Sequence, residues 1–149
     1  MNPSVEERLG GLDHVLYEME MFVHLPMRCD VIMLQNAINE SYLIHARVLC
    51  DFFQQNRRND DIVCEDYGFE RKALGVPDDI EKRFDKSLAH LTYSRLKFTG
   101  NLAEWITDRF RPQLLARIRE FLLYIIANPA LGRPKEIERA HSLLACLNS

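Results

Sequence analysis

The stretch DVIMLQNAINESYLIHARVLCDFFQQ, residues 30–55, decides the fold class of this chain. Its apolar side chains recur at steps of three and four residues, which places them on one side of an α-helix. These positions are Leu34, Ala37, Ile38, Tyr42, Val48, Leu49, Phe52 and Phe53. No stretch of the sequence keeps the alternation of apolar and polar residues that is typical of a half-buried strand. The sequence therefore predicts an all-α protein.

Capping and helix-breaking residues indicate further helices on both sides of this stretch. Ser4 and Glu7 have the spacing of a capping box and predict a first helix over Val5–His24, which Pro26 ends. Pro112 either kinks a later helix or starts a new one. We expect residues 1–149 to form a single bundle of five or six helices with an up-down core. The later helices should cover 77–97, 101–127 and 134–147. Residues 62–76 should form a loop with one short turn.

The composition is that of a globular protein. A hydrophobic share of 47% with 28% charged residues lies far from the balance at which chains stay disordered. The longest apolar run, Phe121–Ala127, is far below the roughly 18 residues that a membrane-spanning helix needs, and no signal peptide is recognisable at the start, so a cytoplasmic location is expected. The cysteines form no C-x-x-C pair, which predicts four buried free thiols: Cys29, Cys50, Cys64 and Cys146.

No cofactor and no metal are expected from the motifs in the chain. A Gly-rich phosphate-binding loop is missing from the sequence. A di-iron helical bundle uses two Glu-x-x-His pairs, whereas this sequence holds one such spacing, Glu138 and His141. The candidate functional residues must therefore be sought among polar side chains in unusual places.

Two polar side chains interrupt the apolar side of the helix at 30–55. Ser41 and His45, four residues apart, project into the middle of its apolar positions, and Arg95 falls on the apolar side of the predicted helix at 77–97. A buried polar group costs on the order of 1–3 kcal/mol unless it is hydrogen-bonded. We therefore expect Ser41, His45 and Arg95 to form a buried polar network with partners on other helices.

A column of polar residues lies beside the apolar side of the predicted helix at 77–97. Arg83, Ser87, His90 and Ser94 follow one another at steps of four, three and four residues, so their side chains point in one direction. Such a column can face a cleft.

Two segments of the chain resemble known proteins. ESYLIHARVLCDFF, residues 40–53, and LAHLTYSR, residues 88–95, resemble blocks in an uncharacterised group of small bacterial helical proteins. The second segment also resembles the HEPN superfamily of helical domains, which often act as metal-independent ribonucleases. The HEPN signature is an arginine and a later histidine with four to six residues between them, and Arg83 and His90 match it with six.

The HEPN resemblance implies a homodimer that binds or cleaves RNA. Two copies of the motif would meet across the dimer, with Arg83 holding the phosphate and His90 assisting proton transfer as a ribose 2′-hydroxyl attacks. The seven-residue step suits this role, because it returns both side chains to one face of a helix about 10 Å apart. The substrate-binding residues would be Ser87, Ser94 and Tyr93.

Two functions stay open at this point. Residues 95–119 carry six basic against two acidic side chains, which allows a local anion-facing surface. The alternative to an RNA-directed enzyme is a non-catalytic helical module that binds or regulates a protein partner, with the polar network fixing how its helices pack. Arg47 and Asp51, on the opposite side of the helix at 30–55, are then either a solvated ion pair or part of a second interface.

Overall fold

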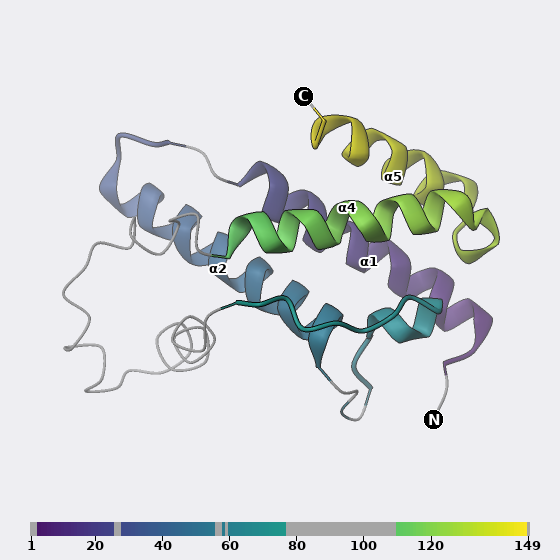
Figure 1. The fold of residues 1–149 in the computed structure, drawn as a ribbon. Helices are drawn as coiled ribbons and strands as arrows, with labels where there is room; N and C mark the ends of the chain where they lie inside the picture. The colour runs from purple at the N-terminus through teal and green to yellow at the C-terminus, as the bar shows by residue number, and fades with distance from the viewer. Residues whose placement is uncertain (1–2, 26–27, 56–57, 59, 77–109, 149) are drawn as a thin grey trace.

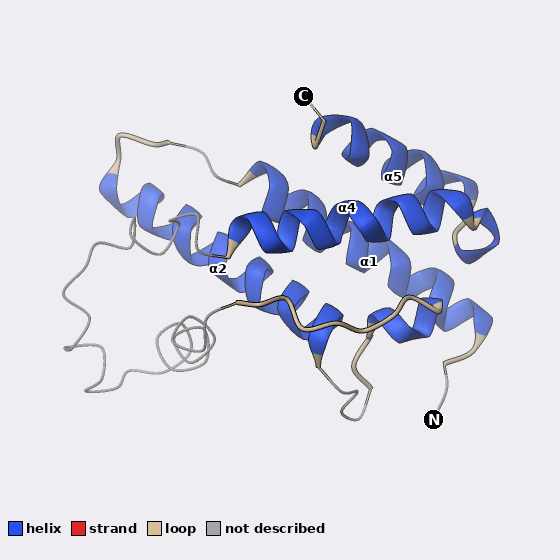
Figure 2. Ribbon diagram, viewed as in Figure 1, coloured by secondary structure: helices blue, strands red, loops and turns tan. Residues whose placement is uncertain are grey.

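A computed structural model describes residues 3–25, 28–55, 58, 60–76 and 110–148. Within these ranges all regular structure is helical and no strand occurs (Figure 2). Their elements are α1 (Val5–His24), α2 (Ile32–Gln54), the 3-10 helix η1 (Cys64–Tyr67), α4 (Arg111–Ala127), the 3-10 helix η4 (Pro129–Leu131) and α5 (Pro134–Cys146) (Figure 1). The all-α class is confirmed for this part of the chain, with four α-helices where five or six were expected overall. The helix predicted over 77–97 lies outside the described residues.

Two start signals read from the sequence, the capping box and Pro112, act at the beginning of α1 and of α4. The Ser4 hydroxyl accepts a hydrogen bond from the Glu7 amide at 3.2 Å, and the Glu7 carboxylate accepts one from the Ser4 amide at 2.7 Å. The two hydrogen bonds with Ser4 hold the pKa of Glu7 below its ordinary value. Pro112 occupies the first turn of α4, so it starts a helix rather than kinking one.

The predicted apolar side of α2 is wrong in part. Leu34 and Val48 are exposed, as is the run Val31–Leu34 at the start of the helix. The buried face is instead centred on Leu43, Ala46 and Cys50. This face is buried because α2 packs against α1 and α4. Periodicity alone did not locate this face, because apolar residues occupy almost every side of the helix.

The core is built around the ring of Phe121 on α4, which is fully buried. Phe52 and Phe53 of α2 approach it with ring centroids 5.3 and 5.9 Å away. Tyr67 and Phe69, from η1 and the loop after it, approach at 5.9 and 5.2 Å. The predicted loop with one short turn at 62–76 is confirmed, since η1 is its only helical turn. This loop is packed into the core.

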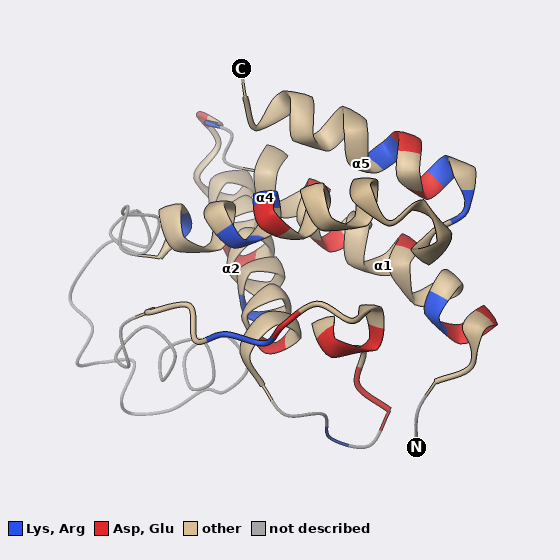
Figure 3. Cartoon of the chain, turned by 45° about the vertical axis from the view of Figure 1, so that its right-hand side comes forward, with Lys and Arg blue, Asp and Glu red and all other residues tan. Residues whose placement is uncertain are grey.

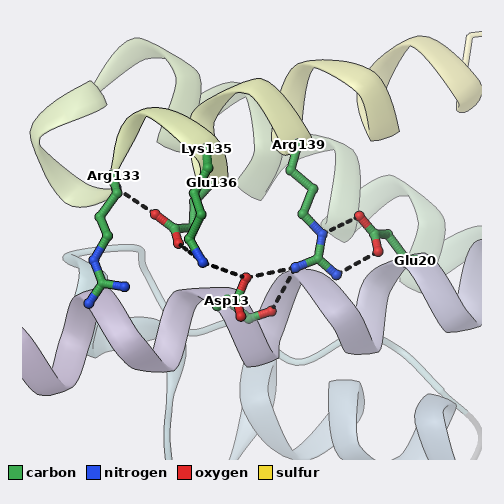
Figure 4. A network of polar contacts seen from close by, with 6 residues as sticks. All are labelled: Asp13, Glu20, Arg133, Lys135, Glu136 and Arg139. Carbon is green, nitrogen blue, oxygen red and sulfur yellow. Dashed lines mark hydrogen bonds and ion pairs between the residues drawn. The ribbon is translucent and has the colours of Figure 1, made fainter.

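Ion pairs between α1 and α5 hold the last helix on the bundle (Figure 4). Arg139 donates hydrogen bonds to both carboxylate oxygens of Glu20, and to one oxygen of Asp13 at 2.8 Å. The Lys135 amine lies 3.8 Å from the same Asp13 oxygen and 3.3 Å from the carboxylate of Glu136, whose side chain is fully buried. A bidentate guanidinium–carboxylate pair is the stronger and more directional kind of ion pair, so it sets the register of α5 on α1.

Gly10 and Gly11 are neighbours in the sequence but have different roles in α1. A Cβ atom at Gly11 would lie 2.9 Å from the Tyr67 hydroxyl oxygen, whereas a Cβ at Gly10 would meet nothing within 4 Å. The Tyr67 hydroxyl donates a hydrogen bond to the carbonyl of Arg8 at 3.1 Å. Burial raises the pKa of Tyr67 well above its ordinary value. Gly11 therefore makes room for η1 against α1.

Alanine substitution at the two glycines should have opposite effects on stability. We expect Gly10→Ala to raise the free energy of unfolding by about 0.5–1 kcal/mol, because glycine is that much less favourable than alanine inside a helix. We expect Gly11→Ala to lower it by about 1–3 kcal/mol, because the new methyl group would displace the packed Tyr67 ring and its hydrogen bond. Urea unfolding followed by circular dichroism measures both. Equal effects at the two positions would contradict the close approach of Tyr67.

Candidate functional site

A groove of about 860 Å³ lies between α1, the second half of α2 and the segment before η1. Acidic residues occur on η1 and on the segment before it (Figure 3), and of these Asp61 lines the groove. On α1 and on α2 the charged positions of the groove are four residues apart, so each helix presents two of them on one face. The charged and titratable side chains that line the groove are His14, Glu18, Arg47, Asp51, Arg58 and Asp61.

Apolar side chains form the floor of the groove and part of its rim. Val15, Leu49 and Val63 are buried beneath it, whereas Val48 and Ile62 are each 41% exposed. A concave surface with apolar contacts and a few charged groups around them is the usual form of a binding site in proteins. The groove can therefore hold an apolar side chain between charged neighbours.

Arg47 and Asp51 belong to this groove. The sequence left open whether they form a solvated pair or a second interface. Nε of Arg47 lies 4.0 Å from a carboxylate oxygen of Asp51, and both side chains are about 40% exposed. A pair of this kind contributes little to stability. Because both side chains are exposed to this extent, a molecule bound in the groove can contact them.

His45 is buried and has its hydrogen-bonding partner on another helix, as predicted. Its Nδ1 lies 2.6 Å from a carboxylate oxygen of Glu18 on α1, and only 8% of His45 is exposed. A carboxylate can only accept, so Nδ1 carries the hydrogen and donates it. The ring of Tyr17 contacts the imidazole edge to face, with centroids 5.8 Å apart. This contact ties the second half of α2 to α1.

The rest of the predicted polar network is not tested by the described residues. Ser41 is only half-buried, and Arg95 lies outside the described residues. Sequence reasoning missed Glu18, although its position three residues after Val15 and four before Phe22 places it at the border of the apolar side of α1. That border position is the signal that could have identified Glu18 as a partner for a buried polar side chain.

The residues predicted to act on RNA are not placed by the structure. The proposed catalytic pair, Arg83 and His90, lies outside the described residues. The same holds for the predicted substrate-binding residues Ser87, Ser94 and Tyr93. Their roles stay predictions that the geometry neither supports nor contradicts.

Two arginines of the predicted anion-facing segment serve the fold instead. Arg111 donates a hydrogen bond to the carbonyl of Phe22 at 3.3 Å, near the C-terminal end of α1. Arg117 is buried, with its guanidinium 4.1 Å from the centre of the Phe69 ring. Arg119 is exposed. Periodicity cannot tell a basic residue that stacks in the core from one that faces a ligand.

The groove is suited to binding charged groups rather than to nucleophilic catalysis. Its described lining holds three carboxylates, two guanidinium groups and one imidazole, but no serine, threonine, cysteine or lysine. The four cysteines form no disulfide, but only Cys50 and Cys64 are buried, so the prediction of four buried thiols is wrong for Cys29 and Cys146. Among the described residues no group of three or more potential metal ligands comes together. None of the helices in the described ranges has the length and hydropathy to cross a membrane.

No family model, no curated protein and no solved structure matches this chain. The resemblance to small bacterial helical proteins and to the HEPN superfamily therefore stays a prediction.

A double-mutant cycle measures the strength of the contact between His45 and Glu18. We expect Glu18→Ala, His45→Ala and the double variant to show a coupling of about 1–2 kcal/mol in the free energy of unfolding, because each single change leaves a largely buried partner without its hydrogen bond. The matched control is the exposed pair of Arg47 and Asp51, for which we expect less than about 0.5 kcal/mol. Additive effects at His45 and Glu18 would contradict the bond.

Proposed function

We propose that this chain is a helical protein–protein interaction module whose contact site is the groove between α1 and α2. The observation that carries this proposal is the combination of exposed apolar side chains, Val48 and Ile62, with charged side chains around them. Protein interfaces share this arrangement of an apolar centre within a polar rim.

The charges of the groove favour a partner segment with basic side chains. Three carboxylates, from Glu18, Asp51 and Asp61, face two guanidinium groups, so the lining is slightly acidic while its histidine is neutral. Opposite charge across an interface raises the association rate and selects the partner. We propose a short segment of a protein partner that places an aliphatic side chain between Val48 and Ile62 and a lysine or arginine beside the carboxylates.

The same charges disfavour RNA in this groove. A polyanion gains affinity by placing its phosphates against lysine and arginine, and here carboxylates outnumber the basic groups. A HEPN-like ribonuclease or RNA-binding homodimer stays the second candidate because of the spacing of Arg83 and His90. The groove does not bear on that candidate, since both residues lie outside the described part of the chain.

Peptide selection on the intact protein tests the proposed site. We expect peptides selected from a display library to combine basic and aliphatic residues and to bind with affinities in the micromolar range, about 8 kcal/mol. Val48→Lys and Ile62→Lys should each weaken this binding at least about tenfold, because each adds positive charge and removes an apolar contact. Fluorescence anisotropy with a labelled selected peptide measures the dissociation constants.

Leu123→Lys is the matched control for the peptide experiment. Leu123 is 49% exposed on α4 and does not line the groove, so this change adds the same charge at a different place. We expect its peptide affinity to equal that of the unsubstituted chain. Selected peptides that bind Val48→Lys and Ile62→Lys as well as the control would refute the groove as the contact site.

RNA digestion in the presence of EDTA separates the two candidate functions. If the chain is an interaction module, the unsubstituted protein should release no more RNA fragments than the Arg83→Ala and His90→Ala variants do. Light scattering first checks that the three proteins form the same assembly. Cleavage that withstands the chelator and is lost in His90→Ala would instead establish a metal-independent ribonuclease, and would give Arg83 and His90 the roles that the HEPN resemblance implies.

A further inference from the structure

The hydrogen bond between His45 and Glu18 connects a buried imidazole with the groove. Glu18 lines the groove and 23% of its side chain is exposed. The same carboxylate accepts the bond from His45, whose own side chain is almost fully covered. A charge on His45 therefore acts on molecules in the groove mainly by compensating the charge of Glu18.

The bond can persist in both charge states of the imidazole. Because a carboxylate only accepts, Nδ1 of His45 keeps its hydrogen in the neutral and in the charged form, and a second proton binds at Nε2. Histidine is the side chain that ordinarily changes its charge between about pH 5 and pH 8. Protonation of His45 thus alters the charge next to Glu18 without breaking the contact between α1 and α2.

The charge balance of the groove is close enough to zero for one proton to matter. Three carboxylates against two guanidinium groups leave a net charge of −1 while both histidines are neutral. A positive charge on His45 brings this balance to zero, and one on His14, which lines the groove directly, adds to it. The groups facing this pair and the groove are Tyr17, Glu18 and His14 from α1, Arg47 and Asp51 from α2, and Arg58 and Asp61 from the segment before η1.

We infer that His45 is a pH-sensitive electrostatic switch for the groove and acts through Glu18. Protonation of His45 lowers the attraction of the groove for cations, so a basic segment binds more weakly when the imidazole is charged. Because the two equilibria are linked, binding of a basic segment also disfavours protonation of His45 by the same factor. The use of this switch to regulate a partner rests on the proposed function, but the switch itself is a property of the groove.

A charged thiol reagent measures the potential of the groove without a partner. The reporter is Val48→Cys in a chain that also carries Cys29→Ser, Cys146→Ser and His14→Gln. Its modification rate is measured with a cationic methanethiosulfonate, which bears a trimethylammonium group, and with an anionic one, which bears a sulfonate. The ratio of the two rates reports the potential, because the fraction of thiolate affects both reagents equally.

We expect the ratio of cationic to anionic rates to fall about fivefold between pH 7.5 and pH 5.5, a size typical of charge coupling over short distances in partly screened sites. Adding His45→Gln should abolish this fall, because glutamine can still donate to Glu18 but gains no charge. A fall that persists in His45→Gln, or a ratio that does not change with pH in the reporter chain, would overturn the switch.

Two controls keep the test decisive. In the first control the reporter is Leu123→Cys, which is on α4 and away from the groove. There the change of the rate ratio with pH should be the same with and without His45→Gln. Should His45→Gln fail to fold by circular dichroism, Glu18→Gln takes its place and must lower the ratio already at pH 7.5; an unchanged ratio rejects the switch. Because no peptide takes part, failure of the peptide selection and failure of the switch are separate results.

Discussion

The packing of aromatic rings around Phe121 is the interaction on which the rest of the described structure depends. Phe121 brings together α4, the end of α2 and the segment that carries η1. Aromatic pairs at these distances add about 0.5–1.5 kcal/mol each beyond the burial of their area. Phe52 contacts Phe121 on one side and lines the groove on the other. The core therefore fixes two of the groove's three boundaries, the second half of α2 and the segment before η1, and a change in the packing of Phe121 would alter the groove as well.

Local signals predicted much of the fold because local physics determines those features. The start of α1 follows from the capping box of Ser4 and Glu7, and the start of α4 follows from Pro112. The buried face of α2 was predicted less well. Val48 was assigned to the apolar side but lies at the rim of the groove, because the neighbours of a helix, and not its own periodicity, decide which of several apolar faces is covered.

The candidate site shows the same division between local and non-local information. His45 was identified as a residue that needs a partner, because a polar side chain within an apolar face is visible in the sequence. Its partner Glu18, 27 residues earlier in the chain, depends on how α1 and α2 are packed. The groove depends in addition on Asp61 and Ile62, which reach α1 only because η1 is held in the core. No spacing rule connects these residues.

Helix α1 separates contacts that keep their charge from contacts that can change it. Towards α5 it presents Asp13 and Glu20 to Arg139, and the hydrogen bond with Glu20 holds the pKa of that guanidinium above its ordinary value. Towards α2 it presents Glu18 to His45, an imidazole. A fall in pH towards 5 therefore leaves the positive charge that holds α5 in place, while it can change the charge beside the groove. This separation allows the groove to respond to protons while α5 stays attached to α1, because the two sets of contacts share a helix but no titrating group.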